Sequence, residues 1–112
     1  MPVWGTFSVE LEPVIPFTRW RILRVLDKPD NPRFGLHLCG YNPDGREGRV
    51  SSRIMEIDRD KRSVKTRSGR IYELHGESGV DGDADYVLRV WLSGHGVKDF
   101  EFLEGLPENA LA

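Results

Sequence analysis

One cysteine and three histidines are the residues of this chain best suited to nucleophilic or metal chemistry. Cys39 and His37 are two positions apart in a strand-like stretch, so both side chains are expected on one face. A thiolate activated by a histidine base, with His75 as a further partner, would make a thiol-dependent enzyme. The sequence carries no family signature for such an enzyme. A buried Cys39 that behaves as a small hydrophobe is the simpler interpretation.

The same residues are poor candidates for a metal site. A zinc site needs more ligands than His37 and Cys39, and the chain has neither Cys-x-x-Cys nor His-x-x-x-His. Asp81, Asp83 and Asp85 have the spacing that begins a calcium loop, but the glycine and glutamate required further along are absent. Glycine-rich phosphate or dinucleotide motifs are also absent. We therefore predict no metal, no cofactor and no enzymatic activity.

The charges are strongly polarised along the chain, although the formal net charge is only −2. Residues 46–70 contain nine basic residues against four acidic ones, whereas residues 71–112 contain nine acidic residues against two basic ones. Residues 1–45 are balanced, with five of each. An asymmetry of this kind concerns partners and solubility rather than the fold.

The basic segment predicts a contact surface for a macromolecule, either a nucleic acid or a protein. Such side chains can neutralise phosphates, and each contact adds salt-dependent affinity. In the alternative interpretation these charges solvate the outer face of a sheet and protect its edges. The pI of about 5.9 is low for a dedicated nucleic-acid-binding domain. The residues predicted to make the contact are Arg59, Lys61, Arg62, Lys65 and Arg67.

The acidic C-terminal third supports a different hypothesis. Its carboxylates would imitate a phosphate backbone and occupy the basic groove of a nucleic-acid enzyme, in the manner of anti-CRISPR or anti-restriction proteins. A third hypothesis joins the two poles, because opposite charges on one small domain favour self-association into a homo-oligomer. The acidic residues concerned, beyond those of the predicted helix, are Asp99, Glu101, Glu104 and Glu108.

The elements that position these residues are mostly strands. Alternating apolar residues predict strands over 3–11, 20–26 and 34–41, with Pro13 and Pro16 in a loop or at an edge. Residues 49–75 predict a three-stranded meander with a polar tip at 59–62 and a tight turn at Ser68–Gly69.

After a Gly/Ser/Asp-rich connection the periodicity changes to that of a helix, over about 83–94. Asp83 is the predicted N-cap, and the apolar stripe places Val87 and Trp91 in the core, beside Tyr86 and Val90. A last strand is predicted over about 97–103. The expected fold is mainly β (α+β): a strongly bent antiparallel sheet or small barrel with one helix in the C-terminal half.

The length and the composition of the chain limit the number of domains and the class of protein to which it can belong. A chain of 112 residues is expected to form a single domain, 1–112, and its eleven aromatic residues argue against disorder. One cysteine cannot form an internal disulfide, which favours a cytoplasmic location. The first residues lack the pattern of a signal peptide and no apolar run is long enough for a membrane span, so no membrane association is expected.

One stretch resembles a known group of sequences. Residues 47–52 (Glu-Gly-Arg-Val-Ser-Ser), followed by residues 66–74 (Thr-Arg-Ser-Gly-Arg-Ile-Tyr-Glu-Leu), are similar to a pattern in short uncharacterised bacterial proteins. The resemblance covers about a quarter of the chain and consists of turn and strand residues. It implies a bacterial or mobile-element protein and transfers no active site.

Overall fold

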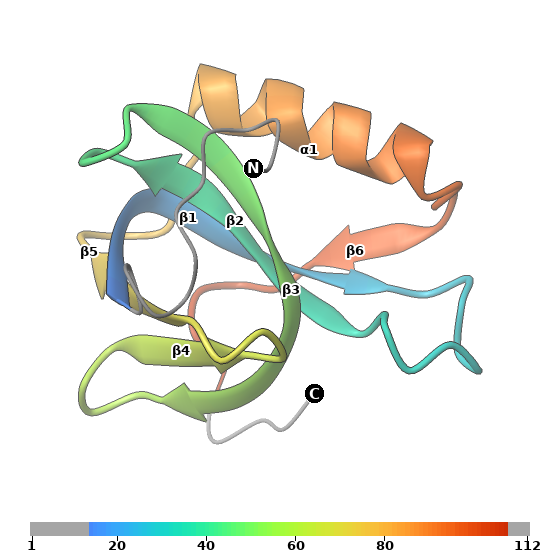
Figure 1. The fold of residues 1–112 in the computed structure, drawn as a ribbon, viewed down its shortest axis with the longest axis horizontal. Coiled ribbons are helices and arrows are strands. Elements are labelled where there is room, and N and C mark those ends of the chain that lie inside the picture. Colours follow the sequence, from blue (N-terminus) through green and yellow to red (C-terminus); the bar gives the residue numbers. More distant parts are fainter. Residues whose placement is uncertain (1–13, 108–112) are drawn as a thin grey trace.

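The computed structural model describes residues 14–107, which form six strands and one helix (Figure 1). The strand predicted over 3–11, and Glu108, lie outside the described residues. The elements in chain order are β1 (Val14–Val25), β2 (Leu36–Asn42), β3 (Glu47–Asp58), β4 (Ser63–Thr66), β5 (Ile71–His75), α1 (Gly82–Gly94) and β6 (Phe100–Phe102).

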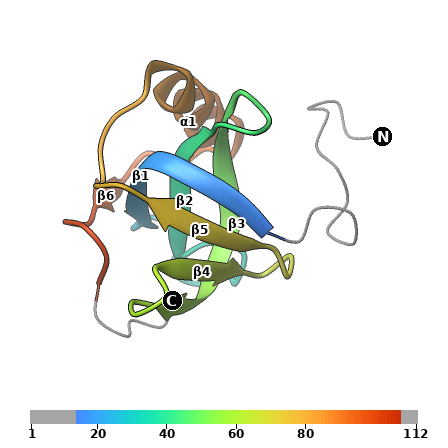
Figure 2. The same cartoon turned by 90° about the vertical axis from the view of Figure 1, so that its left-hand side faces the viewer.

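Five strands close into a small barrel. β1 to β5 follow one another as antiparallel neighbours, and β5 then pairs with β1 to complete the ring. Because a meander of five strands brings its first and last strand together in the same direction, the β1–β5 pair is parallel. Figure 2 shows β1, β5 and β4 side by side on one wall. The predicted mainly β fold with one helix is confirmed, and the sheet is mixed rather than wholly antiparallel.

The barrel interior is filled by side chains from all five strands. Phe17 and Tyr72 pack with ring centroids 4.7 Å apart, and Trp20 is only 2% exposed. Leu103 and Leu106, which follow β6, are half-buried against the same core. The other strand residues in this cluster are Ile15, Ile22, Leu36, Leu38, Ile54, Ile57, Val64 and Leu74.

Pro16 lies inside β1, not in a loop as one reading of the sequence predicted. It pairs with Glu73 of β5, whereas the pairing of β1 with β2 begins only at Thr18. Within residues 14–107, the start of β1 therefore has a strand neighbour on one side only. A proline is tolerated there because no second ladder requires its missing N–H.

The helix α1 covers the outer face of β2 and β3, as Figure 1 shows above the barrel. Its N-cap is Asp81, not the predicted Asp83, because the Asp81 carboxylate accepts a hydrogen bond from the Ala84 backbone N–H at 3.0 Å. This bond satisfies one of the free amides of the first turn.

The buried stripe of α1 also differs from the prediction. Ala84, Leu88 and Leu92 face the barrel, whereas Tyr86 is 69% and Val90 48% exposed. Val87 and Trp91 are half-buried, beside the stripe rather than within it. The small Ala84 lies on this face because the first turn of the helix lies directly against the backbone of β3 at Gly48.

A second apolar cluster joins the helix to the barrel. Leu88 and Leu92 pack on Leu23, Val25 and Cys39 of the outer barrel face, together with Val97 beyond the helix. β6 is shorter than predicted and pairs with the end of β1. In the described part of the chain, no helix is both long and apolar enough to cross a membrane.

Candidate functional site

Cys39 and His37 both lie on the outer face of β2 beneath α1, as their spacing predicts, but neither has the free group that a thiol enzyme would need. Cys39 is 1% exposed beneath α1, and burial raises the pKa of its thiol to about 11. His37 is also buried, and backbone groups occupy both of its ring nitrogens: Nδ1 lies 3.1 Å from the Ser51 carbonyl oxygen, and Nε2 accepts from the Gly35 N–H at 3.3 Å. His75 is exposed at the end of β5, beside Glu73. Among residues 14–107, no group of three His, Cys, Asp or Glu side chains is placed to hold a metal ion.

We expect Cys39 to be unreactive in the native protein. A thiol that is buried and has a raised pKa supplies almost no thiolate at neutral pH, and thiolate is the reactive form. Alkylation by iodoacetamide near pH 7, followed by mass spectrometry, should be much slower for the folded protein than for the denatured chain. Equal rates in the two states would contradict this placement of Cys39.

The five predicted contact residues are all exposed, but they do not form one uniform surface. Arg59, Lys61 and Arg62 belong to the turn between β3 and β4, whereas Lys65 lies on β4 and Arg67 follows it. Their local roles differ, and the difference decides which of them are available to a partner.

Arg62 connects the β3–β4 turn to the end of β5 and to the residue that follows it. Its Nε donates to the Leu74 carbonyl at 3.3 Å, its Nη2 donates to the Gly76 carbonyl, and its guanidinium carbon lies 5.9 Å from the centre of the Trp20 ring. Its φ of 51° places the backbone in the left-handed region, where the turn leads into β4. Arg62 is therefore a structural residue as well as a cation.

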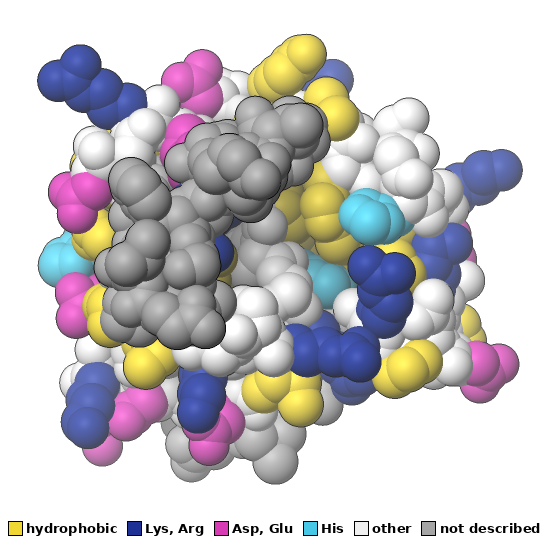
Figure 3. Space-filling model, in the orientation of Figure 1, with side chains coloured by type: hydrophobic (Ala, Val, Ile, Leu, Met, Phe, Trp, Pro, Cys, Tyr) yellow, Lys and Arg dark blue, Asp and Glu magenta, His cyan; other side chains and the backbone are white. Residues whose placement is uncertain are grey.

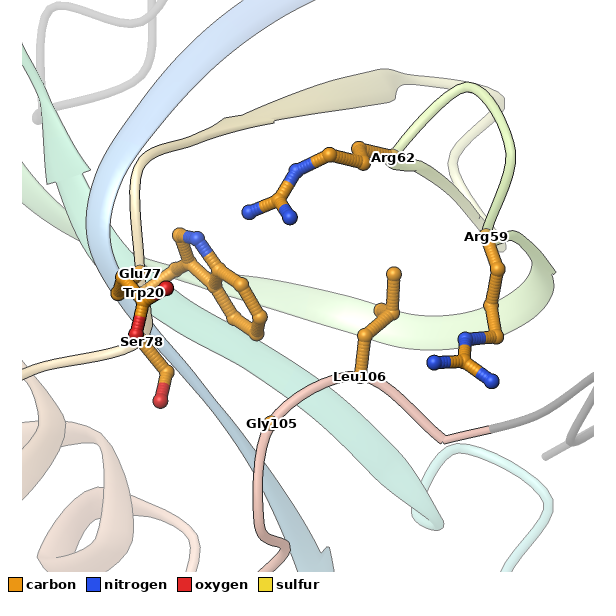
Figure 4. Close-up of a pocket in the computed structure, with 7 residues that line it drawn as sticks. All are labelled: Trp20, Arg59, Arg62, Glu77, Ser78, Gly105 and Leu106. Carbon is orange, nitrogen blue, oxygen red and sulfur yellow. The ribbon is translucent and has the colours of Figure 1, made fainter.

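Arg62 and Arg59 line a hollow of about 220 Å³ at this end of the barrel (Figure 4). Figure 4 shows the Arg62 guanidinium extending toward the Trp20 indole and Arg59 beside Leu106. The remaining lining residues are Glu77, Ser78 and Gly105. The carboxylate of Glu77 in the lining disfavours a phosphate in this hollow, so we do not assign the hollow as the contact site.

Lys65 and Arg67 are the predicted residues most available to a partner. Val64 and Thr66, which alternate with them, are buried in the barrel, so Lys65 and Arg67 point outward. Neither forms an ion pair with any residue of 14–107. The Arg67 N–H donates to the Arg53 carbonyl at 2.8 Å, which places Arg53 of β3 next to them on the sheet.

The acidic third of the chain, by contrast, is partly neutralised within the molecule by arginines of β1. Arg24 pairs with Glu101 at 2.8 Å, where β6 lies against β1. Arg21 contacts Asp85 at 3.4 Å, and Arg19 lies 3.7 Å from Asp81. The sequence separates these partners by more than 60 residues, so the pairing was not foreseen.

An aromatic cluster that the sequence analysis missed lies at the C-terminal end of α1. The Trp91 ring lies 4.8 Å from the rings of both His37 and His95, and Phe34 lies 5.9 Å from Trp91 and 5.5 Å from His95. The only local signal is the spacing of Trp91 and His95, which places them on adjacent turns of one helix face.

No protein-family model, curated protein sequence or solved structure matches this chain, so function is inferred from the geometry of the molecule itself.

Proposed function

We propose that this protein is a small non-enzymatic binding protein that contacts a nucleic acid through a basic face on the outer side of β3 and β4. The basic face consists of Arg53, Lys65 and Arg67. Lys61 and Arg59 continue it onto the β3–β4 turn, while Arg62 maintains the shape of that turn.

The observation that carries the proposal is that Lys65 and Arg67 are exposed without an ion-pair partner among residues 14–107, whereas part of the acidic third is neutralised by arginines. Asp81, Asp85 and Glu101 are each paired with an arginine. Charges without internal partners are available to an external polyanion, and phosphates are the polyanion that such contacts serve most often.

The spacing of the basic residues on this face suits contact with the phosphates of a nucleic-acid backbone. Lys65 and Arg67 are two residues apart and lie roughly 7 Å apart along an extended backbone. Arg53 is on the neighbouring strand, at a strand spacing of roughly 4.8 Å. Lys65 and Arg67, spaced in this way, can contact neighbouring phosphates of one backbone, while the Arg53 guanidinium extends toward the β1–β2 loop, where it donates to the Pro32 carbonyl.

The acidic hypothesis is less well supported by the same contacts. A protein that imitates a phosphate backbone needs carboxylates that are free to meet a basic groove. Here Glu101 is held by Arg24, and Asp85 by Arg21 and Arg89. The net negative charge of this region then serves solubility.

Reversing both charges of the basic face is expected to weaken nucleic-acid binding by about 100-fold, since each lost charge-assisted contact is worth about 1.5 kcal/mol. The variant is Lys65→Glu with Arg67→Glu, measured by fluorescence anisotropy with a labelled oligonucleotide. Both side chains are exposed, so the thermal midpoint of unfolding should change little.

The matched control is Arg89→Glu with Lys98→Glu, which changes the net charge equally on α1 and the segment after it. It should retain most of the affinity, because the basic face is intact. Equal losses in both variants would mean that overall charge alone governs binding and would overturn the assignment of the basic face.

A further inference from the structure

We propose that the rings of Phe34, Trp91 and His95 form an aromatic platform that stacks an unpaired nucleobase, so that the preferred partner of the basic face is single-stranded. This inference rests on the proposed function and adds the class of nucleic acid to it. His37 supports the platform from below and is not part of the contact, because it is 1% exposed.

The aromatic platform reaches the surface. His95 is exposed, while Phe34 and Trp91 are half-buried. The rings meet at interplanar angles between 56° and 74°, so none of these contacts is a parallel stack. Bases stack readily on such surface aromatics, and every base offers a flat face for this contact.

Two cations lie at the edges of the platform. Lys28 Nζ is 5.9 Å from the centre of the Phe34 ring. The Arg53 guanidinium donates to the Pro32 carbonyl at 3.0 Å and lies so close to Gly35, the residue after Phe34, that an added Cβ there would be 2.7 Å from Arg53 Nε. Within the described part of the chain neither Lys28 nor Arg53 forms an ion pair. Aromatic rings between unpaired cations suit a base and its flanking phosphates.

The platform is continuous with the basic face. His37 of β2 is the register partner of Arg53 on β3, and Arg53 in turn bonds Arg67 through the backbone. Arg53 therefore links the two surfaces, because its backbone lies beside Arg67 and its guanidinium lies beside Pro32 and Gly35. Figure 3 shows histidine and apolar side chains together with lysine and arginine side chains on the part of the surface between α1 and the β1–β2 loop.

A single strand fits this combination better than a duplex. In a duplex the bases are stacked on one another and their faces are closed to a protein, whereas unpaired bases can be splayed onto aromatic side chains. A protein that used only its basic face would bind both forms through their phosphates alone.

The test compares three labelled ligands of equal length, each of about 15 nucleotides: single-stranded oligothymidylate, the same backbone without bases, and a duplex. Anisotropy titrations should show wild-type protein binding the oligothymidylate about tenfold tighter than the abasic strand. His95→Ala and Phe34→Leu should each remove most of that preference while leaving abasic binding unchanged. The control is Tyr86→Leu, which removes an exposed ring from another face of α1 and should keep the preference.

The outcomes separate the two proposals. If wild-type protein binds the abasic strand or the duplex as tightly as the oligothymidylate, the platform is wrong and the basic face stands. The same conclusion follows if both ring variants keep the preference. If no ligand binds in a salt-sensitive way, the proposed function fails and the platform fails with it. Since His95 is exposed, its variant remains informative even if Phe34→Leu is poorly folded.

Discussion

Replacing Gly48 by alanine is expected to lower the free energy of unfolding by about 3 kcal/mol, the upper range for overpacking a tight contact. Gly48 lies in β3 under the first turn of α1. A Cβ built there would be 2.5 Å from the Ala84 nitrogen and from the Asp83 carbonyl. These are backbone atoms, so the clash cannot be relieved by a rotamer change, and the helix must move away from the barrel.

Chemical denaturation, followed by circular dichroism, measures this effect. Gly94→Ala is the matched control, because no atom lies within 4 Å of the position that its Cβ would occupy. Alanine at this helix position should be neutral or stabilising by up to about 1 kcal/mol. If both alanine variants had wild-type stability, α1 would not be packed on β3 as described.

The second large effect concerns His37 and pH. Burial, together with the nearby charges of Arg53 and His95, lowers the pKa of His37 from 6.5 to about 4, against the opposing effect of the hydrogen bond to Ser51. Between these two pH values the unfolded chain takes up a proton on His37 and the folded protein does not. The contribution of the neutral His37 ring to the free energy of unfolding is therefore complete above about pH 6.5. It is lost as the pH falls toward 4, and the total loss is about 3 kcal/mol.

Urea unfolding at a series of pH values checks this expectation. His37→Asn removes the titrating ring and should flatten the pH dependence in this window, at the cost of a lower stability at pH 7. His95→Ala, which removes an exposed histidine, should keep most of the dependence, because burial is the largest cause of the lowered His37 pKa. The interpretation is wrong if the wild-type stability is constant between pH 6.5 and 4.

The parts of the fold that the sequence predicted correctly depend on short-range patterns. The alternation at Val64 and Thr66 and the turn at Ser68–Gly69 mark the hairpin between β4 and β5 locally. The closure of the barrel does not follow from such patterns, because it depends on the pairing of Val14–Thr18 with Ile71–His75, far apart in the chain.

The helix shows how a tertiary contact overrides a local pattern. Tyr86 and Val90 are more prominent apolar residues than Ala84, so a stripe drawn through them looks convincing. The close approach to Gly48 instead selects the face that carries Ala84. Size, not hydrophobicity, decides which face is buried at this crossing.

The candidate site could be predicted only in part for the same reason. Lys65 and Arg67 are predictable because charges that alternate with apolar residues indicate an outward strand face. The aromatic platform is not predictable in this way because it joins Phe34, before β2, to Trp91 of α1 and to His95, the residue that caps α1. Only the packing of α1 on the barrel brings these segments together.

The most direct test of the basic face is the salt dependence of binding to a labelled single-stranded oligonucleotide. Affinity would be measured between about 50 and about 200 mM salt for the wild-type protein and for Lys65→Glu with Arg67→Glu. We expect the affinity of the wild-type protein to fall steeply as the salt concentration rises. In a plot of log affinity against log salt concentration, the slope for the variant should be smaller in magnitude by about 1.4, because each of the two lost phosphate contacts contributes about 0.7. Identical affinities and slopes for the two proteins would contradict the proposal that the basic face binds nucleic acid.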